Sequence, residues 1–138
     1  MSAKFTDLDP VLVYNKFIER LTPILGDDVT FGSSINWIGS ELFGDRWGGV
    51  FTRDEEYPTD CYCVVNMDSK DGVGSHWIAV GGGMQYDSFG RKNALRRRDL
   101  PSTERDPEQN ISEYNCGVRA LAWLCTLNML GVQKASQI

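Results

Sequence analysis

The chain has 138 residues, of which 41% are hydrophobic and 24% are charged, and these values fit one soluble globular domain with enough length for a core. Its net charge of −5 argues against nonspecific nucleic-acid binding as the main task. No apolar run approaches the roughly 20 residues that a membrane span requires, and the first residues lack a signal-peptide pattern. We therefore expect residues 1–138 to form a single intracellular domain without a membrane part.

The four cysteines are Cys61, Cys63, Cys116 and Cys125. Cys61 and Cys63 flank one residue of a strand-like run, so their side chains should point the same way and cannot easily pair with each other. A zinc site needs two well-spaced Cys/His pairs, which one histidine and a C-x-C motif do not supply. We expect free thiols in a reducing compartment and no metal.

The N-terminal segment predicts an amphipathic helix of about three turns. Asp9 can cap it, Pro10 suits its first position, and apolar residues then recur at helical spacing until residues 23–26 end it. We expect this helix to be a structural cover. Residues 31–51 are rich in aromatic residues and glycine and predict an irregular wall with one helical turn near residues 38–42. That wall is either core or a groove that a substrate backbone approaches.

Residues 61–67, 76–80 and 84–89 predict three antiparallel strands joined locally as a small meander. Residues 81–83, all glycine, are expected to form the hairpin turn between the second and third strands. A phosphate loop would instead need a Lys-Ser/Thr pair and a following helix. A turn of this length would place Val80 beside Met84.

The only dense basic run lies in residues 91–98. A solvated helix face or loop is the usual interpretation, and the alternative is a weak contact with nucleic acid or an acidic partner. The residues that would make that contact are Arg91, Lys92, Arg96, Arg97 and Arg98. A polar connector over residues 100–110 then leads to the last helix.

The pattern from Cys116 to about residue 130 predicts a buried helix, because nearly all of its positions are apolar, and Gly131 closes it. Cys116 would lie in the first turn, where unpaired N–H groups and the helix dipole favour the thiolate over the thiol. A small buried hydrophobic residue is the alternative interpretation of Cys116. Cys125 lies in the middle of the helix and is expected to be inert core.

A thiolate that attacks an acyl carbon needs a base and then an acid for the leaving amine, and histidine can serve as both near neutral pH. His76 is the only histidine, and the meander would bring it near the level of Asp87 or Ser88, so Asp87 could orient its ring. The Gln109 amide and the Cys116 backbone N–H would stabilise the oxyanion. Each residue alone could have a structural role, but together they predict a cysteine peptidase that needs no cofactor for its chemistry.

The order His76-Trp77, Asp87, Gln109 and Asn115-Cys116-Gly117 resembles the fold group of the adenovirus-type maturation proteases (adenain-like) and the SUMO-specific proteases. The interval of seven positions between Gln109 and Cys116 is that of the adenain-like enzymes. Gly-Ser-His-Trp-Ile-Ala (74–79) and Tyr-Asp-Ser-Phe-Gly (86–90) also resemble their motifs, and the similarity covers roughly residues 40 to 131. Asp87 stands where those enzymes have glutamate, and its shorter interval from His76 implies a tighter hairpin.

The resemblance implies an α+β fold in which a small, mainly antiparallel sheet packs against a central helix that carries the nucleophile. It assigns His76 as base, Asp87 as orienter, Gln109 as oxyanion donor and Cys116 as nucleophile. It further implies a cysteine endopeptidase that processes viral capsid or core precursor proteins during virion maturation, in the host cytoplasm or nucleus or packaged in the virion. An activating peptide or DNA also belongs to that family. The alternatives are an isopeptidase that removes ubiquitin-like proteins and a non-catalytic binding module on the same fold.

Overall fold

The computed structural model describes residues 8–26, 31–67, 76–103, 107, 109 and 115–138. The helices and strands in chain order are α2 (Pro10–Leu25), α3 (Gly32–Phe43), the 3₁₀ helix η1 (Gly44–Arg46), β1 (Trp47–Thr52), β2 (Tyr62–Asn66), β3 (Trp77–Gly81), β4 (Met84–Tyr86), α4 (Cys116–Leu130) and α5 (Val132–Ala135). The expected α+β class is confirmed. The local connection expected between the first two predicted strands, residues 68–75, lies outside the described residues.

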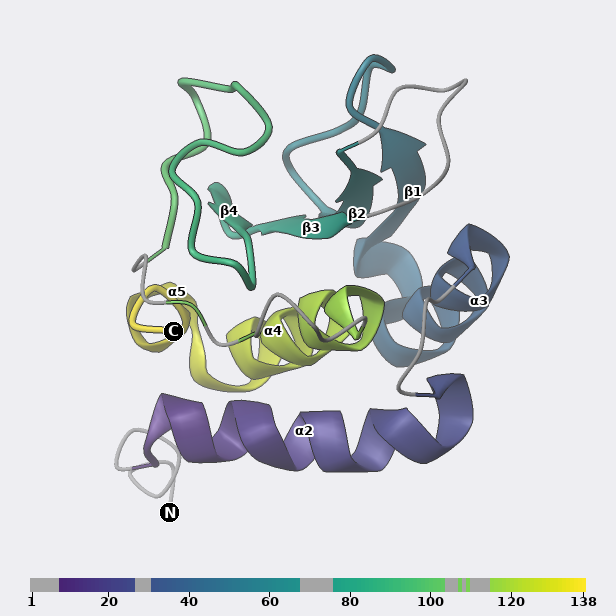
Figure 1. Ribbon diagram of the computed structural model, residues 1–138, viewed down its shortest axis with the longest axis vertical. Helices are drawn as coiled ribbons and strands as arrows, with labels where there is room; N and C mark the ends of the chain where they lie inside the picture. The colour runs from purple at the N-terminus through teal and green to yellow at the C-terminus, as the bar shows by residue number, and fades with distance from the viewer. Residues whose placement is uncertain (1–7, 27–30, 68–75, 104–106, 108, 110–114) are drawn as a thin grey trace.

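The four strands form one mixed sheet in the order β1-β2-β3-β4. The β2–β3 and β3–β4 pairs are antiparallel, which confirms the predicted meander, but β1 adds to it as a parallel neighbour of β2. Figure 1 shows α4 between this sheet and α2, so that the helix lies at the centre of the molecule. The sheet is therefore mixed, with its antiparallel part next to the helix that carries Cys116.

The segment 31–51 is more regular than its sequence predicts. In place of an irregular wall with one helical turn, it contains the twelve-residue α3 and the strand β1. Ile35, Ile38 and Phe43 form the buried side of α3, at helical spacing that its glycines and serines obscure. A Cβ at Gly39 would lie 2.4 Å from the Trp47 ring, so this glycine is needed for close packing of helix against strand. Part of this segment is therefore core, whereas Phe31 and Trp37 are exposed.

The hairpin between β3 and β4 turns through two residues, Gly82 and Gly83, and not three. Their φ angles of +59° and +76° match a type I′ turn, for which glycine is well suited. Gly81 consequently pairs with Met84 and Val80 with Gln85, so the predicted pairing of Val80 with Met84 was wrong by one residue. The third strand was also predicted too long, because β4 ends at Tyr86 and the chain then turns.

The helices α2 and α4 begin and end near the residues predicted for them, but α2 has 16 residues and so exceeds the predicted three turns, and the short C-terminal α5 was not predicted. Asp9 accepts a hydrogen bond from the Val11 backbone N–H at 3.0 Å and so caps α2, whose first residue is Pro10. The helix α4 begins at Cys116, and the next residue after it is the C-cap Gly131. Nearly every side chain of α4 is buried, against the sheet on one side and against α2 on the other. The helix carrying Cys116 is thus fixed from two sides.

A second hydrophobic cluster covers the sheet face that α4 leaves open. Val65, Ile78 and Val80 of the sheet pack there against Leu95 and Leu100 of the loop that follows β4. The basic run therefore belongs to a loop and not to a helix. Its apolar residues anchor it to the sheet.

All four cysteines are free, as expected from their spacing. Burial raises the pKa of Cys125 to about 12, which agrees with an inert position in the core. Burial raises the pKa of Cys63 to about 12 as well. Among the helices that the structure describes, none has the length and apolar character needed to cross a membrane.

Candidate active site

His76 lies directly before β3, at the end of this interior strand. Its backbone oxygen accepts a hydrogen bond from the Met67 N–H at 2.9 Å, which extends the β2–β3 pairing and fixes the position of the residue. The side chain is buried, with 4% of the residue exposed, and the ring of Phe89 stacks on it at a centroid distance of 4.4 Å. The imidazole is therefore held flat against an aromatic face.

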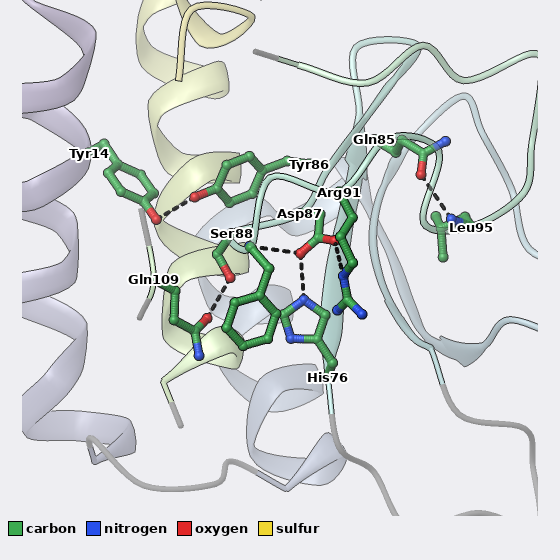
Figure 2. A network of polar contacts seen from close by, with 10 residues as sticks. Tyr14, His76, Gln85, Tyr86, Asp87, Ser88, Arg91, Leu95 and Gln109 are labelled. Carbon is green, nitrogen blue, oxygen red and sulfur yellow. Dashed lines mark hydrogen bonds and ion pairs between the residues drawn. The ribbon is translucent and has the colours of Figure 1, made fainter. Parts of the chain in front are cut away.

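Asp87 follows β4 at the open end of the same hairpin, and its carboxylate holds the His76 ring (Figure 2). The Nε2 of His76 donates to Asp87 Oδ1 at 2.6 Å. The same oxygen accepts from the Phe89 backbone N–H at 2.9 Å, and Oδ2 accepts from Arg91 Nε at 3.0 Å. The Gly90 N–H donates to the Asp87 backbone oxygen at 2.8 Å, so Asp87 also begins a turn. Asp87 therefore both begins a turn and accepts a hydrogen bond from the His76 ring.

The pKa values of the buried His76 and Asp87 are shifted in opposite directions. Burial by itself would lower the pKa of His76, but the hydrogen bonds and charges of Asp87 and Cys116 outweigh it and raise that pKa above 6.5. Burial would likewise raise the pKa of Asp87, but His76, the Phe89 N–H and Arg91 lower it below 3.8. Both shifts favour an imidazolium beside a carboxylate.

The other ring nitrogen of His76 is the one available to a nucleophile. Nδ1 is buried and makes no hydrogen bond to any atom of the described residues. Cys116 contributes to raising the pKa of His76, so its side chain lies within electrostatic reach of the ring. In enzymes without bound substrate, contacts between a nucleophile and its base are commonly long and tighten only in the complex.

Cys116 is the first residue of α4, as predicted, and 5% of it is exposed. Asn115 occupies the N-cap position, but its side chain makes no capping bond to the first turn of the helix. Its Oδ1 instead accepts from Arg119 Nε at 3.1 Å. Asn115 therefore does not cap the first turn of α4 through its side chain.

Gln109 is fixed by Ser88, the residue after Asp87. The Ser88 hydroxyl donates to Gln109 Oε1 at 2.5 Å, and the Gln109 backbone N–H donates to the Ser88 oxygen at 3.0 Å. Figure 2 shows the amide nitrogen at the end of the Gln109 side chain that points away from Ser88. The structure thus brings Gln109 to the Asp87 turn. From the sequence, Ser88 is predicted only as a neighbour in register, because a serine in a turn carries no local signal of a partner 21 positions away.

A second series of hydrogen bonds joins α2 to this region, and the sequence does not predict it. The hydroxyl oxygens of Tyr14 and Tyr86 lie 2.5 Å apart in the core, as Figure 2 shows. Arg119 Nη1 donates to the Tyr14 hydroxyl at 3.3 Å, while its Nε donates to Asn115 Oδ1. The helix α2 was expected to be only a cover, but through Tyr14 it links the residue before Asp87 with the residue before Cys116.

Two arginines of the predicted basic run have different surroundings. Arg91, placed in the basic run, pairs with Asp87 and belongs to the site. Arg97 pairs with Asp99 away from the site, and its guanidinium lies 5.1 Å over the Tyr57 ring. Within the described ranges, no group of three or more His, Cys, Asp or Glu side chains is placed to hold a metal ion.

Comparison of the chain with known protein families, with curated proteins and with solved structures finds no match. A functional assignment must therefore be argued from the geometry of the site itself. The geometry consists of an oriented buried imidazole, a thiol at a helix N-terminus and a fixed carboxamide.

Proposed function

We propose that this protein is a cysteine peptidase in which Cys116 attacks a peptide carbonyl, His76 handles the proton and Asp87 orients His76. The observation that carries the proposal is the state of the His76 ring. Its Nε2 is bound to Asp87, while its buried Nδ1 lacks a hydrogen-bond partner in the described residues and has the Cys116 side chain close by. A purely structural histidine would be expected to have both nitrogens satisfied.

The arrangement supports a defined sequence of proton and bond changes. His76 takes the thiol proton on Nδ1, and the sulfur of Cys116 forms a bond to the carbonyl carbon. The oxyanion that results accepts hydrogen bonds from the Gln109 amide and the backbone N–H of Cys116. His76 then donates its proton to the leaving amine as the C–N bond breaks, and water hydrolyses the thioester through the same imidazole.

For the substrate we propose viral capsid or core precursor proteins, on the strength of the resemblance to adenain-like maturation proteases. The α+β architecture with Cys116 at the start of the central helix is compatible with that fold. An isopeptidase acting on ubiquitin-like proteins would use the same four residues. Cleavage of a peptide library, compared with release of a ubiquitin-like protein from an isopeptide-linked conjugate, separates the two. Adding DNA or viral peptides to both assays shows whether either activates the enzyme.

Alkylation of the thiols tests the nucleophile without a substrate. Iodoacetamide at neutral pH should label Cys116 faster than Cys61, although Cys116 is buried and Cys61 is half-buried. Burial raises the pKa of Cys61, as does the neighbouring charge of Asp60, and burial raises the pKa of Cys63 and Cys125 more strongly. Mass spectrometry of tryptic peptides over time gives the four rates. Equal rates for Cys116 and Cys61 would contradict an activated thiolate.

Loss of the Gln109 amide should slow catalysis and leave substrate binding nearly unchanged. The Gln109→Ala variant is expected to lower kcat by about 10²- to 10³-fold, because one oxyanion donor contributes mainly in the transition state. Gln133→Ala removes an exposed glutamine from α5 and serves as the matched control. Steady-state kinetics on a library-derived peptide measure both. A normal kcat for Gln109→Ala, or an effect confined to KM, would exclude Gln109 as the donor.

A further inference from the structure

Residues 91–103, here called the basic loop, have a charge opposite to that of the protein as a whole. They contain five cationic side chains and one carboxylate, for a net charge of +4, whereas the entire chain carries −5. The proposed peptidase chemistry uses only Arg91 of these residues. The remaining cations therefore form a local positive region with no assigned task.

A cavity of about 360 Å³ is formed within the basic loop. The polar residues that line it are Lys92, Asn93, Arg97, Arg98, Ser102 and Thr103, and no carboxylate is among the lining residues. Guanidinium, ammonium, amide and hydroxyl groups are the donors that phosphate oxygens accept hydrogen bonds from. The lining thus fits an anion, and its volume is in the range of small-molecule sites.

The cavity is built on a fixed scaffold. Gln85 of β4, which is 1% exposed, donates from Nε2 to Asn93 Oδ1 at 2.9 Å and to the Leu100 oxygen at 2.7 Å. Its Oε1 accepts from the Leu95 N–H at 3.0 Å, a contact drawn in Figure 2. The Asn93 N–H in turn donates to the Ser102 hydroxyl at 2.8 Å. The loop is therefore ordered before any ligand binds, which lowers the entropic cost of binding.

Two of the three lining cations are not neutralised by the described residues. Arg97 is paired twice with Asp99, at 2.8 and 2.6 Å. Lys92 and Arg98 are exposed and form no ion pair with any described carboxylate. An arriving anion would therefore meet two exposed positive charges of the lining that no described carboxylate pairs with.

We propose that this cavity binds a small anion made of linked phosphate groups, either an inorganic polyphosphate or the polyphosphate part of a nucleotide. A long nucleic acid is the less favoured ligand, for two reasons. The positive region is concave and confined to one loop, and the rest of the chain carries a net charge of −9 that would repel a backbone extending beyond it. The inference concerns a site separate from the proposed catalytic residues and stands whether or not the chain is a peptidase.

The test is titration of the whole chain with sodium tripolyphosphate, followed by isothermal titration calorimetry and by the thermal unfolding midpoint. One saturable site and a raised Tm are expected. Lys92→Gln and Arg98→Gln should each weaken binding by about tenfold, the effect of losing one charged hydrogen bond. Arg20→Gln, which removes the same charge from an exposed position of α2 on the far side of α4 from the sheet, should leave the affinity unchanged. Both loop residues are exposed, and circular dichroism confirms that their variants fold.

Three outcomes would overturn the proposal. The first is no measurable binding of tripolyphosphate, and the second is equal weakening by Arg20→Gln, which would mean a general charge effect. The third is a DNA duplex that binds through Lys92 and Arg98 with an affinity rising with its length while tripolyphosphate fails to compete. Tighter binding of adenosine triphosphate than of tripolyphosphate would support the site and assign a nucleotide as its ligand. None of these readouts requires peptide cleavage, so a failed peptidase proposal would leave them interpretable.

Discussion

The Cys116→Ala variant is expected to lose peptide cleavage almost completely, with kcat reduced by about 10⁶-fold, the loss typical when a covalent nucleophile is removed. The remaining groups can still bind and polarise a carbonyl, but no side chain at the start of α4 can form the thioester. Because alanine retains the backbone and most of the volume of this buried residue, the loss of stability should be only about 1 kcal/mol. Steady-state kinetics and thermal unfolding measure the two effects separately.

Cys125→Ala is the matched control for this experiment. It removes the same atom from the same helix, at another buried position, but from apolar surroundings about two and a half turns further along α4. It should lose a similar amount of stability and retain full activity. If Cys116→Ala cleaves at the normal rate, or if Cys125→Ala is the inactive variant, the proposed nucleophile is wrong.

Asp87→Asn is expected to reduce kcat by about 10²- to 10⁴-fold and to move the alkaline limb of the pH profile of kcat/KM to lower pH. Burial lowers the pKa of His76, but its hydrogen bonds and charge interactions with Asp87 and Cys116 outweigh this effect and raise the pKa above 6.5. The imidazolium that protonates the leaving amine therefore persists above pH 6.5, and activity falls as pH rises through the folded-state pKa. Removing the carboxylate charge lowers that pKa, which fixes the direction of the shift.

Asp99→Asn is the control for the pH experiment, because it makes the same chemical change at an exposed carboxylate that is paired with an arginine. Its pH profile should match that of the unaltered chain. An alkaline limb that stays in place in Asp87→Asn would mean that His76 is not the group that titrates. Chemical shifts of the single histidine, followed by NMR through the same pH range, provide the direct measurement.

The parts of the fold that the sequence predicts well are those with strong local signals. The helix α4 was placed within its observed bounds, because its apolar residues run uninterrupted from Cys116 and Gly131 closes it. The Asp9-Pro10 start of α2 is similarly explicit. By contrast, α3 was reduced to one turn because its glycines and serines are weak helix formers, and β1 was missed because glycines occupy two of its six positions.

The ionisable residues of the candidate site were predicted from the sequence, whereas the residues that support them were not. His76, Asp87 and Cys116 are recognisable because their side-chain chemistry is rare and their order is informative. Ser88 and Tyr14 are common residue types, and their roles come from contacts with residues 21 and 72 positions away. Such contacts exist only after the fold has brought the segments together, so no local pattern announces them.

The hydrogen bond between Arg119 and Tyr14 limits the stage of synthesis at which the site can form. The two residues are separated by 105 positions, and Arg119 lies one turn after Cys116 in α4. A ribosome therefore exports the helix that supports the site long before the segment that brings the sulfur. A growing chain that ends between residues 87 and 115 contains His76 and Asp87 but lacks Cys116. Under the proposed mechanism, such a nascent polypeptide would be inactive until α4 has been synthesised.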